Sequence, residues 1–250
     1  MNKNDSAMPL LTASINSKSF GTKRVLGSME ISVAKGELIT LLGASGCGKS
    51  TLLRMIAGLD TDYDGEVYLQ GQLHREISNE IGFIFQEPRL MPWLNVAKNV
   101  AFKSNKPEEE LARVSTLLDE VGLAGTEELL PKELSGGMAQ RVSIARGMFL
   151  KPKLLLLDEP FSAVDAFTRM KLQDLLLSVA KQHGTTVIMV THDIDEAIYL
   201  SDRIIIVGGQ PGVIKEVVTV HQQRPRDRLD ITLASLRTTV LSALHEIQVI

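Results

Sequence analysis

Eight consecutive residues, 43–50 (GASGCGKS), have the types and the spacing that could hold a chain of phosphate groups. They match the pattern G-x-x-x-x-G-K-[ST]. Glycines let the backbone curl until several N–H groups point into one concavity, which binds anions. Lys49 would add a positive charge beside the β- and γ-phosphates, and the Ser50 hydroxyl would ligate Mg²⁺. The segment therefore predicts a nucleoside triphosphate site.

The residues around this motif complete the predicted phosphate-binding set. A helix is expected to begin at Lys49, so that its positive end points at the same phosphates. Thr51 would meet the α-phosphate through its N–H or hydroxyl group. Two interpretations of Cys47 stay open, a small filler or a reactive thiol favoured by the helix N-terminus. The full set is Gly43, Ala44, Ser45, Gly46, Cys47, Gly48, Lys49, Ser50 and Thr51.

A second group that could do chemistry follows the apolar run 154–157 (LLLL). In parallel α/β sheets, ligands bind at the C-terminal ends of the strands. Asp158 stands at such an end and could hold Mg²⁺ through water, while Glu159 could polarise an attacking water molecule. In isolation these two acids could also begin an ordinary turn. The leucine run and the phosphate loop favour the catalytic interpretation.

Strands and helices must alternate along the chain to position these residues. Short apolar or alternating runs predict strands at 37–43, 66–70, 81–85, 154–157, 185–190 and 203–207. Helical spacing predicts helices at 49–59, 169–183, 194–200 and 229–247. This alternation indicates an α/β fold with a mainly parallel sheet.

The chain divides by its sequence character into four kinds of segment. We expect a loose N-terminal arm over residues 1–15 and a nucleotide-binding core over 16–87 and 151–210. Pro88 and Pro92 mark the start of a different, helical pattern, which we expect to be an insert over 88–150. Residues 211–250 are expected to form a C-terminal tail.

The composition excludes several classes of protein. Lys and Arg number 27 against 30 Asp and Glu, so the net charge of −3 argues against a nucleic-acid partner. The single cysteine cannot make an internal disulfide, which favours a reducing, intracellular compartment. No stretch approaches the roughly 20 apolar residues of a spanning helix, and the N-terminus lacks a signal-peptide core. Any membrane role would therefore act through a partner.

Residues 134–138 (LSGGM) supply a second anion-binding device and a resemblance. Ser135 is a good helix N-cap, and the helix end that it starts, with Gly136 and Gly137, could bind an anion. The segment is similar to the signature of the ATP-binding-cassette (ABC) ATPases, and the resemblance runs from Phe20 to His192 in consistent order. It implies a P-loop α/β fold with an antiparallel β subdomain and a helical insert. It also implies ATP hydrolysis with Mg²⁺.

The resemblance also implies roles for single residues. Phe20 would stack on adenine, and Gln86 would join Ser50 and Asp158 at Mg²⁺. Glu159 would be the general base, and His192 would contact the γ-phosphate. Residues 162–165 (SAVD) resemble the family's D-loop, with Val164 where Leu is commoner. Taken alone, Phe20 could be a core residue and His192 a surface residue, but their order behind the signature favours function.

The resemblance further implies an assembly. In the family, each ATP lies between the phosphate loop of one chain and the signature of the other, so Ser135, Gly136 and Gly137 would act in a head-to-tail dimer, with a homodimer expected. A single cassette with no fused spanning helices is typical of an importer subunit. It would lie at the cytoplasmic face of the inner membrane. Its partners would be an integral permease and, indirectly, an extracytoplasmic solute-binding protein.

Three short segments narrow the resemblance further. Residues 85–96 (FQEPRLMPWLNV), 211–214 (PGVI) and 224–226 (RPR) resemble the nitrate/sulfonate/taurine importer group. This implies import of nitrate, a sulfonate, taurine or a related small solute. Two alternatives stay open: the ATPase of an exporter or lipoprotein-release system, and a soluble regulatory ATPase. Trp93 could be an interface anchor or a core residue, and residues 224–228 could be a solvated basic tail.

Overall fold

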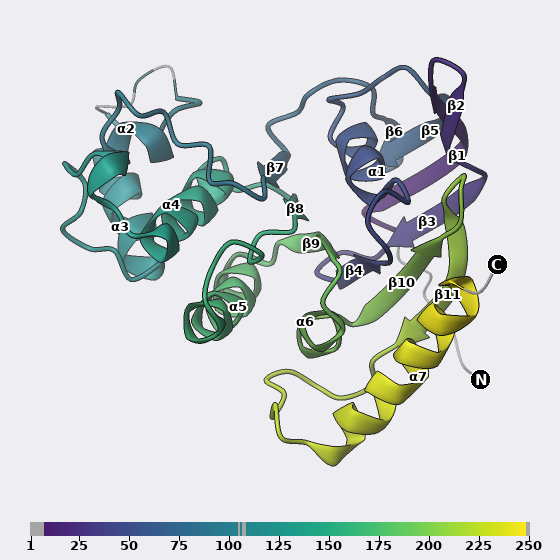
Figure 1. Ribbon diagram of the computed structural model, residues 1–250. Coiled ribbons are helices and arrows are strands. Elements are labelled where there is room, and N and C mark those ends of the chain that lie inside the picture. The colour runs from purple at the N-terminus through teal and green to yellow at the C-terminus, as the bar shows by residue number, and fades with distance from the viewer. Residues whose placement is uncertain (1–7, 105, 107–108, 249–250) are drawn as a thin grey trace, which may run out of the picture. The chain divides into compact units, whose positions relative to one another are not determined.

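The computed structural model describes residues 8–104, 106 and 109–248 (Figure 1). The chain forms two compact units. The first unit comprises Met1–Ser78 and Ile188–Ile250, and the second comprises Asn79–Val187. One strand, β9 (Thr186–Thr191), runs from the second unit into the first.

An antiparallel sheet in the first unit is built around its longest strand. Its strands are β1 (Leu11–Phe20), β2 (Lys23–Leu26), β3 (Met29–Val33), β5 (Asp64–Leu69) and β6 (Gln72–Leu73). β1 pairs with β2, β3 and β5, and β6 pairs with β5. Leu11, Ala13 and Ile15 are buried, because alternate side chains of a strand share one face. β1 therefore begins inside the expected loose arm 1–15, of which residues 1–7 lie outside the described part of the chain.

A pair of parallel strands in the first unit leads to the phosphate loop. β4 (Leu38–Leu42) is buried throughout and pairs in parallel with β10 (Arg203–Gly208). β11 (Val213–Thr219) adds an antiparallel partner to β10. Residues 43–48 connect β4 directly to α1 (Lys49–Ile56). The positive end of α1 thus lies beside the C-terminal end of a buried parallel strand, as the sequence predicts.

Two helices pack against β10 and β11 in the first unit. α6 (Ile194–Leu200) and α7 (Ile231–Gln248) share a buried apolar cluster with these strands, which includes Ile206 and Val240.

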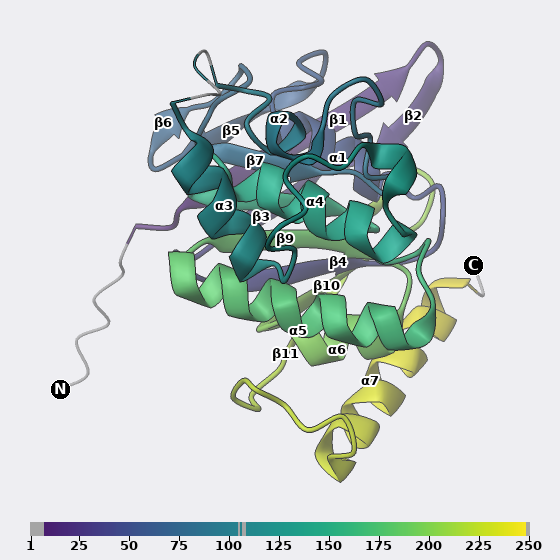
Figure 2. The same ribbon diagram turned by 90° about the vertical axis from the view of Figure 1, so that its left-hand side faces the viewer.

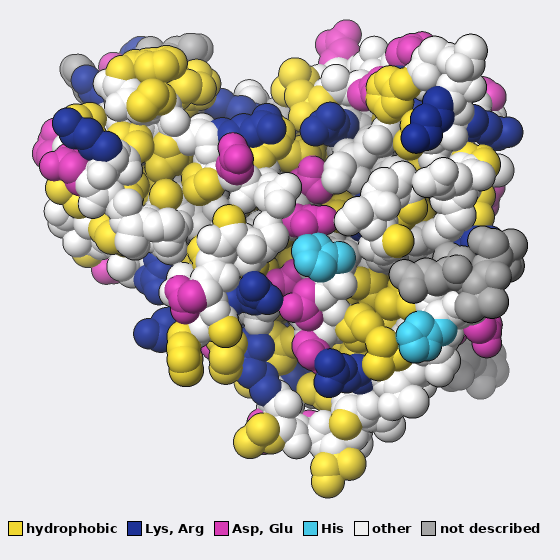
Figure 3. All heavy atoms as spheres, viewed as in Figure 1, with side chains coloured by type: hydrophobic (Ala, Val, Ile, Leu, Met, Phe, Trp, Pro, Cys, Tyr) yellow, Lys and Arg dark blue, Asp and Glu magenta, His cyan; other side chains and the backbone are white. Residues whose placement is uncertain are grey.

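Leu229 and Ile231, at the start of α7, are 87% and 84% exposed. Figure 3 shows hydrophobic side chains at this lower end of the helix. In the part of the chain that the structure describes, no helix is both long and apolar enough to cross a bilayer.

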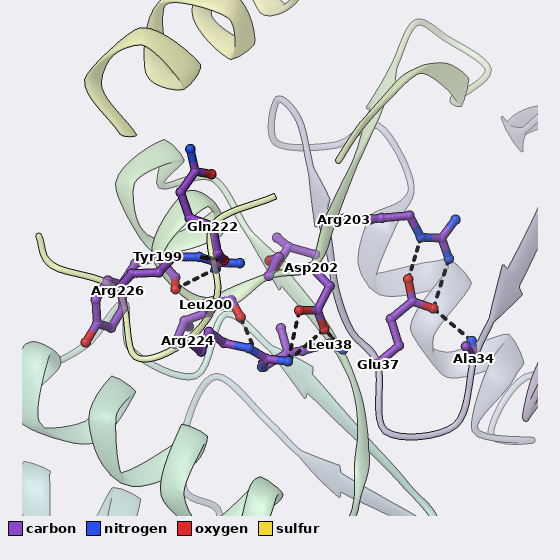
Figure 4. A network of polar contacts seen from close by, with 12 residues as sticks. Ala34, Glu37, Leu38, Tyr199, Leu200, Asp202, Arg203, Gln222, Arg224 and Arg226 are labelled. Carbon is purple, nitrogen blue, oxygen red and sulfur yellow. Dashed lines mark hydrogen bonds and ion pairs between the residues drawn. The ribbon is translucent and has the colours of Figure 1, made fainter. Parts of the chain in front are cut away.

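Arginines that follow β11 close the C-terminal end of α6 (Figure 4). Arg226 Nη1 donates to the carbonyl oxygens of Ile198 at 3.0 Å and Tyr199 at 2.9 Å. Arg224 Nη2 donates to both carboxylate oxygens of Asp202, at 2.9 and 2.8 Å. Arg226 is only 6% exposed, so the interpretation of this segment as a solvated basic tail is wrong. The last carbonyls of a helix have no partner within it and attract cations.

The second unit contains two parallel strands and a group of helices. The strands are β7 (Ile81–Ile84) and β8 (Leu154–Asp158). The helices are α2 (Val96–Val100), α3 (Leu111–Glu120), η1 (Pro131–Glu133), α4 (Gly136–Met148) and α5 (Ala166–His183). α4 packs against α2, α3, α5 and β7, and Figures 1 and 2 show α4 beside α5.

Two features of the second unit bear on the sequence predictions. A Cβ at Gly82 of β7 would lie only 2.6 Å from the carbonyl oxygen of Gly147, so glycine permits α4 to lie against β7. Trp93 is 73% exposed, which excludes the core interpretation. The parallel pairs, the antiparallel sheet and the helices together confirm the predicted α/β class.

Candidate nucleotide-binding site

The phosphate loop has a backbone that only glycine permits at two places. Gly48 is the N-cap of α1 with φ of 95°, and a Cβ there would lie 2.3 Å from Leu26 Cδ2. A Cβ at Gly43 would lie 2.0 Å from the carbonyl oxygen of Val207. The loop is therefore seated tightly between the end of β2 and the end of β10. Its tip, residues 44–46, is exposed.

Lys49 places its ammonium group inside the loop. The side chain is 4% exposed, and its Nζ donates to the carbonyl oxygens of Gly43 and Ala44, both at 2.8 Å. Cys47 Sγ lies 3.7 Å from the same Nζ and 3.5 Å from the Val207 oxygen. Because Cys47 is only 5% exposed, the structure favours the filler interpretation of this thiol.

The turn between β10 and β11 supports the phosphate loop, a structural role that the sequence did not predict. Gly212, between β10 and β11, accepts a hydrogen bond from the Gly27 N–H at 2.8 Å and donates to the Val25 oxygen at 2.9 Å. A Cβ at Gly212 would lie 1.9 Å from the Cys47 carbonyl oxygen. This turn therefore touches the phosphate loop directly. The dipeptide Pro211-Gly212 is a turn signal that follows the strand predicted over 203–207, but no strand was predicted after it.

Phe20 and His192 belong to the same unit as the loop. Phe20 ends β1 and is 54% exposed, so it is not a core residue. His192 is exposed and follows β9 directly. Asp193 fixes the chain just after it: its N–H donates to Thr191 Oγ1 at 3.0 Å, and its carboxylate accepts from the Glu196 N–H at 3.1 Å.

The second unit carries the predicted acids and the glutamine. Asp158 is the last residue of β8, and Glu159 follows it with φ of 47°. Ser162 Oγ donates to the carbonyl oxygen of Glu159 at 3.0 Å, and Gln86 Nε2 donates to Ser162 Oγ at 3.2 Å. The structure therefore joins Gln86 to the backbone of the proposed base through one hydroxyl group. Sequence reasoning had no signal for this contact.

The signature segment forms the start of α4. Ser135 is its N-cap, and the Ser135 Oγ accepts from the Met138 N–H at 3.2 Å. A Cβ at Gly137 would lie 2.7 Å from Thr168 Cγ2, so this end of α4 packs on the first turn of α5. Asp165 caps α5 and accepts from the Thr168 N–H at 3.0 Å. Hydrogen bonds from Thr168 lower the pKa of Asp165.

An open cavity lies before the start of α4. Its volume is about 630 Å³, and its lining includes Ser135, Gly136, Gly137, Arg141, Asp165 and Lys171. The N-terminus of α4 and two basic side chains, Arg141 and Lys171, therefore reach the same space, while the Asp165 carboxylate at its edge already caps α5. Positive helix ends and cations favour an anion there.

Comparisons with known proteins agree with this geometry. A family model described as ABC transporter matches residues 26–162. The aliphatic sulfonates import ATP-binding protein SsuB 1 of Xanthomonas axonopodis pv. citri (strain 306) is 56% identical, across 94% of this chain and 96% of that protein. The SsuB 2 protein of Burkholderia lata is 53% identical, across 97% of this chain and 89% of that protein.

A solved structure is also similar over most of the chain. It is the dimeric structure of a post-hydrolysis state of the ATP-binding cassette MJ0796 bound to ADP and Pi, with 29% identity and a TM-score of 0.72. The match covers 85% of this chain and 100% of that one. The fold is accordingly the P-loop α/β fold of the ABC ATPases, and the relatives confirm the resemblance to the nitrate/sulfonate/taurine importer group. On these grounds, the chain belongs to the ABC transporter family, among its ATP-binding subunits.

Proposed function

We propose that this chain hydrolyses ATP to drive an ABC importer for an aliphatic sulfonate or a related small solute. The observation that carries the ATPase part is the buried Lys49 ammonium inside a glycine loop at the start of α1. The names of the relatives, which are aliphatic sulfonates import proteins, support import over the exporter and regulatory alternatives.

Binding of the nucleotide divides among three groups of residues. Phe20 offers an exposed ring for adenine, and residues 43–51 surround the phosphates. Ser50, Gln86 and Asp158 would hold Mg²⁺, since hydroxyl, amide and carboxylate oxygens are the ligands it prefers. Among the described residues, no group of three or more His, Cys, Asp or Glu side chains is arranged to hold a metal. Phosphate oxygens and water would therefore supply the other ligands.

Hydrolysis then follows from positioning and charge. Glu159 takes a proton from the attacking water as the water oxygen bonds to the γ-phosphorus. The bond from that phosphorus to the bridging oxygen breaks, and ADP and phosphate result. His192 contacts the γ-phosphate, while Lys49 and the loop N–H groups stabilise the charge that develops on the phosphate oxygens. Mg²⁺, when bound, neutralises negative charge on the β- and γ-phosphates.

The proposed assembly is a head-to-tail homodimer. One chain carries two helix N-termini that could bind a phosphate: the start of α1, after the phosphate loop, and the start of α4, after Ser135. A γ-phosphate approached from one side would use only one of them. A two-fold arrangement uses both, because each ATP lies between the loop of one protomer and residues 135–137 of the other. The exposed Trp93 lies in the segment proposed to meet an integral permease. The dimer works at the cytoplasmic face of the inner membrane, with a solute-binding protein outside and no nucleic acid.

Growth on defined sulfur sources tests the import proposal. Cells that lack this chain should fail to grow with ethanesulfonate as the sole sulfur source and should grow normally with sulfate. The wild-type chain should restore growth, and the Glu159→Gln variant should not. Normal growth on a panel of alkanesulfonates and taurine without the chain, in cells with no second sulfonate importer, contradicts the proposal.

A further inference from the structure

Lys18 is a buried cation that the proposed function does not use. It lies in β1, two residues before Phe20, and is 2% exposed. Its Nζ lies 4.5 Å from the centroid of the Phe20 ring. The same Nζ lies 2.8 Å from Asp60 Oδ1, and it also donates to the carbonyl oxygen of Asp62. One buried ammonium thus contacts an aromatic ring and the Asp60 carboxylate, and the exposed Asp62 carboxylate lies 3.6 Å from it.

The strand geometry explains why this lysine meets this ring. Lys18 and Phe20 are two residues apart at the end of β1, and their side chains are in contact there. The register against β2 shifts between Lys18 and Ser19, where an irregularity interrupts the pairing. Such bulges re-aim side chains and are common beside functional sites.

The carboxylate that holds Lys18 is tied to the helix of the phosphate loop. The N–H groups of Leu59 and Asp60 both donate to the carbonyl oxygen of Arg54, in the last turn of α1, at 2.9 and 3.2 Å. Asp60 therefore has a fixed place relative to the end of α1. Lys18 links this place to the ring at the end of β1.

A buried ion pair of this kind is a poor source of stability, because removing both charges from water costs about as much as their attraction returns. What it does provide is a cation with one position. A cation over one part of the Phe20 ring restrains the ring, and 54% of the side chain stays exposed. The positive charge also draws electron density from the ring, which favours stacking with an electron-rich purine.

We propose that Lys18 is a positioning residue for the nucleotide base, which fixes the Phe20 ring in the orientation that stacks on adenine. The proposal rests on the adenine-stacking role of Phe20 in the proposed function. It makes Lys18 a determinant of base binding that leaves phosphate binding alone. A merely structural lysine would affect both equally.

Calorimetry with two ligands separates these roles. The full-length chain is titrated with MgATP and with magnesium tripolyphosphate, which has the phosphates but no base. Lys18→Met keeps the side-chain stem and removes the charge, so the Phe20 ring must be ordered when ATP binds, and ATP binding should weaken about 2- to 10-fold, the cost of immobilising one side chain. Tripolyphosphate binding should stay within about twofold. Lys18→Arg, which keeps the cation, should restore ATP binding.

Three further variants complete the design. Lys18→Met combined with Asp60→Asn removes the charge of the partly buried Asp60 together with its cation, and it should give the same ATP-selective loss if the single variant folds poorly. Lys35→Met removes an exposed lysine from the same unit and should bind both ligands normally. In a Phe20→Ala background, Lys18→Met should cause no further loss, since Lys18 acts through that ring.

The outcomes that overturn the proposal are distinct. Equal losses for ATP and tripolyphosphate, or normal ATP binding by Lys18→Met where Phe20→Ala binds ATP weakly, remove the role of Lys18 but keep that of Phe20. If Phe20→Ala itself binds ATP normally, the adenine-stacking assignment fails and this inference fails with it.

Discussion

At the scale of single residues, the backbone of Glu159 is the most informative feature of the second unit. Its φ of 47° lies in the left-handed region, which residues other than glycine seldom adopt. Such a conformation costs about 1–3 kcal/mol and persists where its surroundings fix it, often at functional sites. Here Ser162 holds the Glu159 carbonyl, and Gln86 in turn holds Ser162. The direction of the carboxylate is therefore set partly by the main chain.

Replacing this carboxylate tests its role as a base. Glu159→Gln keeps the size of the side chain but cannot accept the proton of water, so steady-state ATP hydrolysis should fall about 10²- to 10⁴-fold. ATP affinity should remain within about threefold, because the phosphate loop is untouched. Phosphate release and calorimetry measure the two effects. Glu87→Gln, a neighbouring exposed acid, serves as the control, and hydrolysis by Glu159→Gln near the wild-type rate would remove Glu159 as the base.

Sequence reasoning succeeded at this scale where chemistry depends on neighbours along the chain. Residues 43–51 share one loop and one helix start, so their spacing alone predicts their common role. Lys18 gives no such signal, because its partner Asp60 lies far along the chain, in the loop after α1. The same holds for Gln86 and Ser162. Their contacts depend on tertiary packing that no local pattern contains.

At the scale of elements, the turn between β10 and β11 can lie against the phosphate loop because residue 212 is a glycine, which has no side chain. A Cβ at Gly212 would stand 1.9 Å from the Cys47 carbonyl oxygen, inside any possible contact distance. Since that neighbour is backbone, it cannot rotate away. The turn and the loop can therefore lie together only while residue 212 is glycine.

Gly212→Ala should consequently damage nucleotide binding from outside the motif. We expect ATP affinity to fall about tenfold or more, since displacements of about 1 Å at such sites are costly, and stability to fall by about 1–3 kcal/mol. Gly36→Ala is the matched control: its φ of 76° strains an alanine, but nothing lies within 4 Å of the added Cβ. It should lose about 1 kcal/mol of stability with unchanged ATP affinity. Calorimetry and urea unfolding measure both, and normal ATP binding by Gly212→Ala would contradict the contact.

The end of α6 gives a second prediction at this scale. Arg226→Met keeps an apolar stem but leaves the carbonyl oxygens of Ile198 and Tyr199 without their donor, which should cost about 2–4 kcal/mol in urea unfolding. Burial, and then the neighbouring Arg224, lower the pKa of Arg226, which reflects how poorly water reaches it. Arg237→Met removes an exposed arginine 3.2 Å from Asp195 and should cost under about 1 kcal/mol. Equal losses in the free energy of unfolding for the two variants would show that Arg226 does not stabilise the C-terminal end of α6.

Element boundaries show where sequence patterns stop being sufficient. The helix predicted over 49–59 ends at Ile56 in the structure, because Gly58 takes φ of 71° and turns the chain. α5 begins at Ala166, three residues before its apolar pattern, since Asp165 supplies the cap. The pattern of apolar residues located these elements, and the capping residues decided where they begin and end.

At the scale of the whole molecule, the two anion-binding helix ends make a prediction about two chains. If each ATP needs the loop of one protomer and the signature of the other, Lys49→Ala and Ser135→Glu damage different halves of a shared site. The first removes the charge that holds the phosphates, and the second places a carboxylate against the γ-phosphate. Ser135→Thr keeps the hydroxyl group that caps α4 and is the matched control.

Mixing the two damaged chains should therefore restore one site in every two. All chains carry Glu159→Gln, so that ATP stays bound, and mass is measured by light scattering with MgATP. The Glu159→Gln parent and its Ser135→Thr derivative should dimerise, while the Lys49→Ala and Ser135→Glu derivatives should each stay monomeric. An equal mixture should form dimers of one chain of each kind, because only that pair assembles one intact site and places both defects in the other. If the mixture stays monomeric while the parent dimerises, or if Ser135→Glu dimerises alone, the ATP sites are not shared between protomers, and the cavity before α4 must serve another purpose.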